Sequence, residues 1–339
     1  MDSKFEKWNE LPPEMRLECV KWLDFKSRMQ LRGVSKTDKS LVESAPKYHF
    51  DTVKVEVDID YEPNVTCKEG SVETIKIEEK NGRRTPEFVE KAYHLTIQFL
   101  KFAVIDHFEF WAKFKSDNDK DAKDLVSRIN EVAPMKFKSL QVHTETHDII
   151  NAILKKCDET ETLVLEGSGF GKEPGTRYID FCRYKPFYTA KTFKFMRLSN
   201  PLVQLLIMQK WIEIDMAIGT TIHARYYCPN FISFFVDSFK DRVVHKNNNQ
   251  VRFRTDNPAK HILIRVIPNV PIHQQWEHNV AYTVIPANLK RPEYAKNDQW
   301  AHDFYTYEMN RGVEQAKLRI MSMSDDELRA LMLGSDDED

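Results

Sequence analysis

Apolar residues in the first 45 positions recur with the period of short helices. In the segment EMRLECVKWL, Met15, Cys19 and Leu23 fall at intervals of four, and Leu17 and Val20 mark a second apolar stripe. A short surface helix normally needs only one such stripe. We therefore expect this helix to be buried on opposite sides, by its own module on one side and by a partner on the other.

Two further short helices are expected in the same stretch. Leu-Pro-Pro at 11–13 opens the first helix, because proline is tolerated where the first helical N–H groups lack partners. Asp24 and Ser27 are alternative caps for a second helix, SRMQLR, which Gly33 would end. A third helix is expected over about 37–44.

After these helices the period changes to that of strands. TVKVEVDI (52–59) alternates apolar and charged residues, as a half-buried strand does, and SVETIKIEE (71–79) repeats the pattern more weakly. The apolar residues of HLTIQF (94–99) also stand two apart. Together these segments predict a small antiparallel sheet across about 50–115.

After Pro134 strand and helix patterns alternate. The strand candidates SLQVHT, TLVLEG, TFKFMRLS and IEIDMAI alternate with the helix candidates HDIINAILKKC and NPLVQLLIMQKW. Leu140 and Val142 stand one strand–helix unit before Leu163 and Leu165. Successive units of this kind predict parallel strands lined by helices on one side, similar to an irregular leucine-rich-repeat array, although no asparagine ladder accompanies them.

The remainder of the chain carries later strand candidates and a C-terminus of different character. VRFRT (251–255), HILIRVIP (261–268) and YTVIPA (282–287) have strand patterns. SDDELRALML (324–333) begins with a capping box and predicts an amphipathic helix, which the acidic sequence SDDED follows.

The expected fold class therefore combines α+β and α/β features in four segments. Residues 1–48 form a three-helix module, and residues 49–133 form a small antiparallel β-rich segment. Residues 134–312 form an α/β domain similar to leucine-rich repeats, and residues 313–339 form a C-terminal helix and acidic tail.

Composition narrows the class of protein. A hydrophobic fraction of 41% among 339 residues supports a sizeable core. The formal net charge of -2 indicates neither nucleic acid nor an anionic membrane as partner. The polar N-terminus does not resemble a signal peptide, and no apolar run is long enough to span a membrane. Five scattered cysteines suit a reducing compartment. We therefore expect a cytoplasmic or nuclear protein.

The segment WNELPPEMRLECVKWLDFKSRMQLRGVSKTDKSLVES (8–44) resembles an F-box. The matching positions are a Leu-Pro start with an acidic and an apolar residue, apolar positions of the first helix, Arg and Leu of the second, a Val-Ser-Lys element and a closing apolar pair: Leu11, Pro12, Glu14, Met15, Val20, Leu23, Arg28, Leu31, Val34, Ser35, Lys36, Leu41 and Val42. The aromatic residue usual after the Lys is replaced by Thr37-Asp38. The sequence of this segment is similar to those of the large expanded F-box families of nematodes.

This resemblance implies that the module docks onto the Skp adaptor, and through it onto a cullin scaffold and a RING subunit. The adaptor-binding residues would be Leu11, Pro12, Glu14, Met15, Val20, Leu23, Leu31 and Val34. Burying each apolar side chain among them is worth roughly 1.5–3 kcal/mol before the costs of binding. The alternative is that they only pack a small bundle onto the rest of the chain.

The resemblance also implies that the N-terminal module binds the adaptor and that the remaining chain binds a protein substrate. Its binding residues are not identified by the sequence. The leading hypothesis is a non-catalytic substrate receptor of a ubiquitin ligase. The second hypothesis is a scaffold that uses its F-box outside a ligase, or that sequesters its target. An enzyme with an unrecognised site in 134–290 is a third class, which the sequence does not favour.

Other chemical motifs are weak. His143 and His147 flank Glu145, but zincin chemistry needs the Glu immediately after the first His. GSGFGKEPG (167–175) follows a strand but lacks the Gly-Lys-Ser/Thr ending of a phosphate-binding loop. Cysteines at zinc-ligand spacing and a Gly-x-Ser-x-Gly elbow are missing from the sequence. We therefore expect no catalytic residues, no metal and no cofactor.

Overall fold

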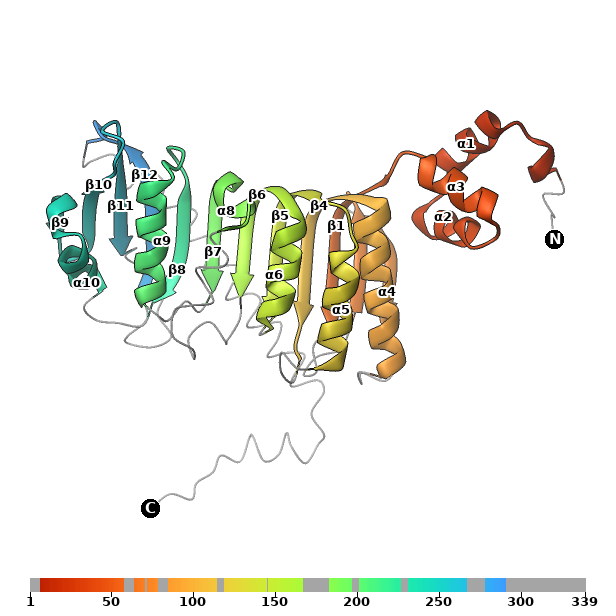
Figure 1. The fold of residues 1–339 in the computed structure, drawn as a ribbon, viewed down its shortest axis with the longest axis horizontal. Coiled ribbons are helices and arrows are strands. Elements are labelled where there is room, and N and C mark those ends of the chain that lie inside the picture. Colours follow the sequence, from red (N-terminus) through yellow and green to blue (C-terminus); the bar gives the residue numbers. More distant parts are fainter. Residues whose placement is uncertain are drawn as a thin grey trace, which may run out of the picture. The chain divides into compact units, whose positions relative to one another are not determined.

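The computed structural model describes most of the chain in two compact units, residues 1–223 and 224–339, and each is considered by itself (Figure 1). The described residues are 7–57, 64–70, 72–78, 85–114, 119–144, 146–166, 183–196, 201–226, 231–266 and 278–290. The loop 167–175 and the expected C-terminal helix 324–333 lie outside them.

The first unit begins with three short α-helices, which confirms the expected N-terminal module. A 3₁₀ turn, η1 (Trp8–Glu10), leads into α1 (Pro13–Lys21), α2 (Phe25–Arg32) and α3 (Lys36–Ser44). Of the two alternative caps, Asp24 is the one that caps α2, because its Oδ1 accepts a hydrogen bond from the Ser27 N–H at 2.7 Å. Ser35 caps α3 by accepting from the Asp38 N–H at 3.1 Å.

The rest of this unit is a sheet in the order β3-β2-β1-β4-β5-β6-β7. Its strands are β1 (Tyr48–Val57), β2 (Asn64–Glu69), β3 (Val72–Glu78), β4 (Ala103–Ala112), β5 (Met135–Thr144), β6 (Cys157–Glu166) and β7 (Thr192–Met196). The pairs β1–β2 and β2–β3 are antiparallel, whereas β1, β4, β5, β6 and β7 run parallel.

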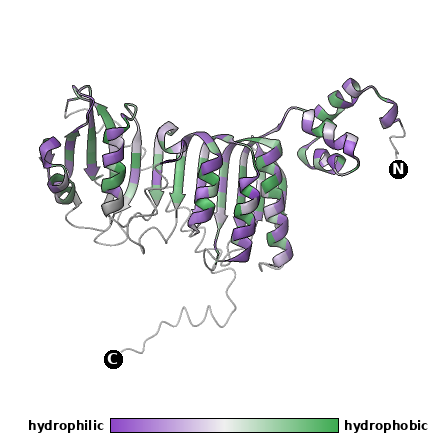
Figure 2. Ribbon diagram, viewed as in Figure 1, coloured by the Kyte–Doolittle hydropathy of each residue, from purple (hydrophilic) through white to green (hydrophobic). Residues whose placement is uncertain are grey.

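Helices connect the parallel strands. They are α4 (Pro86–Phe102), α5 (Lys120–Asn130), α6 (His147–Lys156) and the one-turn α8 (Pro186–Thr189); a further helix, α9 (Pro201–Glu213), follows β7. Figure 1 shows α4, α5 and α6 side by side on one face of the sheet. In Figure 2 these helices carry both hydrophobic and hydrophilic colours, as expected for helices with one side on a sheet and the other in water.

Buried side chains of the parallel strands form ladders across the sheet. Each parallel strand, counted with the residues just before it, buries three side chains with a common spacing. The second lies three positions after the first, and the third lies two positions after the second. The sets are Phe50/Val53/Val55, Ile105/Phe108/Phe110, Phe137/Leu140/Val142, Thr160/Leu163/Leu165 and Ala190/Phe193/Phe195. The strand register places the second members opposite one another, from Val53 to Phe108, Leu140, Leu163 and Phe193. Leu140 and Val142 stand opposite Leu163 and Leu165 in this parallel pair, and the parallel strands expected from successive strand–helix units are confirmed here.

The expected antiparallel sheet over 50–115 is wrong in one respect. The segment 94–99 belongs to α4, and β4 then returns parallel to β1. The helix begins where Thr85 accepts a hydrogen bond from the Phe88 N–H at 3.2 Å, with Pro86 in its first turn. The alternation in HLTIQF competes with a helical period that the flanking residues extend, and the longer pattern prevails. Moreover, β4 pairs with β5, so a boundary at residue 133 does not divide the sheet.

The expected strand IEIDMAI (212–218) is also wrong. Helix α9 continues to Glu213, and the Ile214 N–H still bonds the Lys210 carbonyl at 3.0 Å. The chain then turns at Asp215, which has a φ of 52°. Strand β8 (Thr221–Tyr226) starts only after this turn and crosses the division between the units.

The second unit is antiparallel where a continued parallel array was expected. It contains α10 (Phe231–Ser238), η4 (Lys240–Arg242), β9 (Val243–Asn247), β10 (Gln250–Arg254), β11 (Lys260–Val266) and β12 (His278–Pro286). The strand order is β12-β11-β10-β9, and each neighbouring pair is antiparallel. The turns after β9 and β10 are too short for the crossover that parallel strands need.

Candidate functional site

The N-terminal module has a core of its own. Val20, Val42 and Ala45 are buried together, and partly buried hydrophobic residues pack around them: Trp8, Leu17, Leu23, Met29, Leu31 and Leu41. Val20 has no exposed surface. Leu17 and Val20 on α1 face this core, and so does Leu23 just after the helix, although Leu23 belongs to the other predicted stripe.

The residues expected to bind the adaptor divide into groups by exposure. Pro12, Glu14, Met15 and Val34 are exposed, and Leu11 is half-buried. Met15 is 54% exposed and Val34 is 72% exposed. This exposed set lies on α1, the turn before it and the connection between α2 and α3.

The remaining expected residues support the module from inside. Leu23 and Leu31 pack against its core, and Val20 is enclosed by it. A side chain without exposed surface cannot touch a partner unless the helices separate. Val20 therefore holds α1 in place, and the expectation that it contacts the adaptor directly finds no surface to support it.

The place of the aromatic residue that the resemblance leads one to expect after Lys36 is taken by Asp38. Its carboxylate is buried, and it accepts a hydrogen bond from the Trp8 indole N–H at 2.8 Å and another from the Ser35 hydroxyl at 2.6 Å. The Trp8 ring packs against the module's core. An aromatic ring from the N-terminal turn thus joins this core, and the sequence reasoning did not assign Trp8 a role.

An aromatic cluster joins the module to the sheet. The ring of Phe25, the first residue of α2, lies with its centroid 5.3 Å from that of Phe50 on β1 and 5.0 Å from that of Phe99 on α4. It also meets Tyr48 at 6.0 Å. All but Tyr48 are fully or nearly fully buried. The F-box-like module is therefore packed onto the sheet through contacts distant in sequence.

Arg28 reinforces this joint. Its guanidinium donates to the carbonyls of Lys21, Leu23 and Pro46 at 2.8, 3.0 and 2.7 Å. It also lies 5.1 Å from the centroid of the Tyr48 ring. Burial lowers the pKa of Arg28, and burial together with the hydrogen bond to Glu69 raises the pKa of Tyr48 to about 12. The arginine keeps its charge at any physiological pH.

The sheet face opposite the ladders carries polar and aromatic side chains. Trp111 on β4 stacks on its register partner His143 on β5, with ring centroids 3.5 Å apart. The ammonium group of Lys54 on β1 lies 5.6 Å from the Trp111 ring centroid. Gln141 forms a hydrogen bond with His143. Side chains from three neighbouring strands thus form one patch, which sequence reasoning could not assemble without the register.

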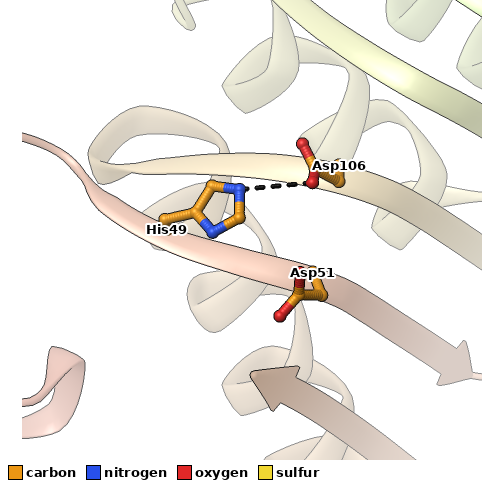
Figure 3. Close-up of side chains that lie close together, drawn as sticks. All are labelled: His49, Asp51 and Asp106. Atoms are coloured by element: carbon orange, nitrogen blue, oxygen red, sulfur yellow. Dashed lines mark ion pairs between the residues drawn. The ribbon is translucent and has the colours of Figure 1, made fainter. Parts of the chain in front are cut away.

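One group of side chains has the chemistry of a cation site (Figure 3). His49 and Asp51 on β1 face Asp106 on β4, and their ligand atoms lie within 4.8 Å of one another. However, Asp106 already accepts a hydrogen bond from the Lys138 ammonium at 2.7 Å and lies 3.3 Å from His49 Nε2. The hydrogen bond from Lys138 is the main reason why the pKa of Asp106 is lowered. Asp51 in turn accepts from the Gly70 N–H. Lys138 thus supplies the positive charge that a metal ion would bring.

The other candidate chemical groups are not assembled into a site. His143 lies on β5 in the stack with Trp111, whereas His147 begins α6. Burial raises the pKa of the Cys157 thiol to about 12 and raises that of Cys67 as well, so both thiols are poor nucleophiles at neutral pH. Within the described parts of the chain, no helix combines the length and apolar character needed to cross a membrane.

Comparison with known families agrees with the geometry of the N-terminal module. The F-box domain family matches residues 8–50. The match covers η1, the three helices and the start of β1, and it includes every residue expected to bind the adaptor. No curated protein and no solved structure matches the chain.

Proposed function

Since the chain is an F-box protein, with its F-box domain at residues 8–50, we propose that it is a substrate receptor of a Skp–cullin–F-box ubiquitin ligase. F-box domains bind the Skp adaptor of cullin–RING ligases. The target and its binding surface are the part of this proposal that goes beyond the family. The observation that carries the proposal is an F-box domain with exposed apolar side chains, packed onto a larger α/β sheet.

The adaptor side of the proposal rests on the exposed residues. Leu11, Pro12, Glu14, Met15 and Val34 would contact the adaptor, while Val20, Leu23 and Leu31 hold the helices that present them. Apolar surface of this kind gains free energy when a partner removes it from water, at roughly 25 cal/mol per Å².

The target side rests on the sheet of the first unit. Its in-register ladders follow the spacing L-x-x-L-x-L of leucine-rich repeats, at intervals of 32, 23 and 30 residues from Phe108 to Leu140, Leu163 and Phe193. We infer an irregular leucine-rich-repeat-like array. Such arrays bind proteins through the strand face away from the helices. Lys54 and Trp111, the partly exposed members of the patch that the buried His143 supports, are our candidates for part of the target-binding surface.

The packing of Phe25 and Arg28 supports a receptor over an independent module. A ligase must hold its target at a fixed place relative to the adaptor, and an F-box joined by buried rings can do so. We expect no catalytic step within this chain, and we expect it to act in the cytoplasm or nucleus.

The second candidate function is a scaffold that binds its target but acts outside a ligase. It needs the same target surface and predicts no ubiquitination. Co-purification with the Skp adaptor, followed by identification of bound proteins with the proteasome blocked, separates the two. The ligase function predicts that the adaptor and a cullin are recovered, and that bound targets carry ubiquitin and accumulate under the block.

A double variant provides the control. Leu11→Ala/Pro12→Ala should lose the adaptor and the cullin but retain the target, because the altered residues lie outside the sheet. Recovery of the adaptor by this variant at the wild-type level would contradict the proposed contact. Stable, unmodified targets in the presence of bound cullin would favour the scaffold.

A further inference from the structure

The four strands of the second unit carry charge of one sign. Strands β9 to β12 contain five lysine and arginine residues, Lys246, Arg252, Arg254, Lys260 and Arg265, and no aspartate or glutamate. In the first unit, by contrast, β1, β4 and β6 each contain acidic residues. Since the whole chain has a formal net charge of -2, this sheet is a basic region of a slightly acidic protein.

The strand register separates this sheet into two faces, of which one is apolar and lies against α10. The ring of Phe235 on α10 has its centroid 5.8 Å from that of Tyr282 on β12. The ring of Phe239, just after the helix, lies 5.8 Å from that of Phe253 on β10. Phe253 and Tyr282 are buried, and the four strands contain no other phenylalanine, tyrosine or tryptophan.

The other face carries a basic stripe of three arginines, Arg252, Arg254 and Arg265. Gln250 on β10 stands opposite Arg265 on β11, and Arg254 stands opposite His261. Alternate side chains of a strand share a face and the strand rises about 3.3 Å per residue, so the stripe is about 13 Å long. The pKa of His261 is lowered, first by burial and then by the charges of Arg252 and Arg254, so both guanidinium groups act on one part of this face.

The acidic residues that the structure describes in this unit lie outside the strands. They are Asp237 on α10, Asp241 in η4 and Asp256 in the turn after β10, where it forms an ion pair with Arg242 at 2.8 Å. The exposed Arg254 side chain donates to the backbone carbonyl of Asp241 at 2.8 Å. This acceptor carries no formal charge, so the contact does not neutralise the guanidinium.

Arg252 has a structural role at the centre of the stripe. It is buried, and it donates to His261 Nδ1 at 2.7 Å and to backbone carbonyls within residues 286–289. It therefore fastens the chain after β12 against this face. At the ends of the stripe Arg254 is exposed and Arg265 is half-buried, so a partner can reach both.

We propose that the basic stripe binds an acidic segment of the target protein, whose carboxylates pair with Arg254 and Arg265. The inference rests on the proposed function, because it identifies the partner with the ligase target, and it adds the chemistry of the segment that is bound. Arginine suits this role, because its planar guanidinium can hold a carboxylate through two hydrogen bonds. An extended segment of about four residues spans the stripe.

An acidic protein segment fits this face better than nucleic acid does. Proteins that bind single-stranded nucleic acid combine positive charge with aromatic rings on which the bases stack. Here the rings of Phe253 and Tyr282 are packed on the other side of the sheet. The face therefore offers charge without a stacking surface.

The test is the fluorescence anisotropy of a labelled peptide of eight glutamates, titrated with the full chain. The wild type should bind this probe, with an affinity that falls as the salt concentration rises. Arg254→Gln should weaken binding about two- to fivefold and Arg254→Glu about five- to twentyfold, as expected for the loss and the reversal of one exposed charge. Arg265→Gln, at the other end of the stripe, should weaken it about as much as Arg254→Gln.

A matched control changes the same charge on the helix side of the sheet. Lys246 is exposed and stands opposite the buried Val251, so Lys246→Glu should change the affinity less than about twofold. Arg254→Gln keeps a donor for the Asp241 carbonyl, and its melting temperature should stay near that of the wild type.

The outcomes separate this inference from the proposed function. It is overturned if the wild type does not bind the glutamate peptide, or if Arg254→Glu and Arg265→Gln both keep wild-type affinity. Tighter binding of an oligothymidylate with eight phosphates would make nucleic acid the occupant and also overturn it. The peptide titration does not involve the adaptor. A chain that binds the adaptor but not the peptide therefore loses this inference alone, whereas a chain that binds the peptide but no adaptor refutes the ligase function.

Discussion

Phe25 offers the most direct test of how the F-box is held. It is 2% exposed, although it is the first residue of a helix in the F-box. Its ring meets Tyr48, Phe50 and Phe99, which belong to β1 and α4, and the residues that form the core around Val20 do not include it. Phe25→Ala should therefore loosen the joint to the sheet more than the F-box itself.

The size of the effect follows from burial and ring contacts. Truncating a buried phenylalanine to alanine costs about 3–5 kcal/mol. The rings of Phe50 and Phe99 approach Phe25 at 5.3 and 5.0 Å, and such pairs contribute about 0.5–1.5 kcal/mol each beyond area burial. We expect a loss in the upper part of that range. Phe25→Leu preserves most of the apolar volume and should cost less than about 1.5 kcal/mol.

Two assays together test this reasoning. Urea unfolding of the first unit gives the loss of stability, and limited proteolysis at residues 45–48 reports the release of the F-box. Because the exposed residues of α1 are unchanged, Phe25→Ala should keep adaptor affinity within about threefold, on the general rule that distant sites act independently. A stability loss below about 1 kcal/mol would show that the rings do not form the joint. Loss of adaptor binding as complete as in Leu11→Ala/Pro12→Ala would show that the joint and the F-box are one cooperative structure.

Three further predictions concern charged groups. Arg28→Lys keeps the charge but cannot reach three carbonyls at once, so it should lower the urea midpoint, and an unchanged midpoint would refute the proposed joint. The pKa of His261 is lowered by burial and by nearby arginines, and its neutral Nδ1 accepts from Arg252 Nε at 2.7 Å. Neutral His261 should thus stabilise the folded protein above about pH 6.5, and this stabilisation should be lost as the pH falls through the lowered pKa of His261. His261→Asn should flatten the fall of the melting temperature between about pH 7 and 5, whereas an identical fall in both proteins would contradict this origin. Lys138→Met should lower the melting temperature at pH 7 but not below the pKa of Asp106, where the carboxylate is protonated in either protein, and a loss that persists in acid would point to packing instead.

The F-box helices could be predicted from sequence because their signals are local. Caps such as Asp24 and Ser35 lie within a few residues of the donors they satisfy.

The joint between F-box and sheet had no such signal. Phe25 and Phe99 meet although 74 residues separate them, and nothing in either segment specifies the other. The same holds for Trp8 and Asp38, whose hydrogen bond replaces the expected aromatic residue. The pattern of apolar and polar residues indicates whether a segment is a helix or a strand. Contacts between such elements depend on strand register and side-chain packing, which cannot be read from a single sequence.

The ladders show where pattern and register combine. In the units of Phe108 and Leu140, the three-then-two spacing of apolar residues is visible in the sequence. The fourth unit, which contains Leu163, begins with Thr160, and the fifth begins with Ala190, so a search for large apolar residues does not reveal the repeat there. Once the strands are in register, the position between the second and third ladder residues of each strand must lie on the other face of the sheet, because successive side chains alternate.

This geometry makes the target surface testable without knowledge of the target. Lys54 stands between the ladder residues Val53 and Val55, and Trp111 directly follows the ladder residue Phe110, so substitutions there change the face without removing the side chains that hold the sheet on its helices. Phe108→Ala, by contrast, opens a cavity in a ladder and should cost about 3–5 kcal/mol. If the face binds the target, Lys54→Glu should release it while the adaptor stays bound; the melting temperature should fall modestly, because the substitution breaks the ion pair with Glu56 and stands opposite Glu109. If Lys54→Glu leaves target binding intact, and a substitution on the sheet face of the second unit abolishes it, the target-binding surface lies on the second unit instead.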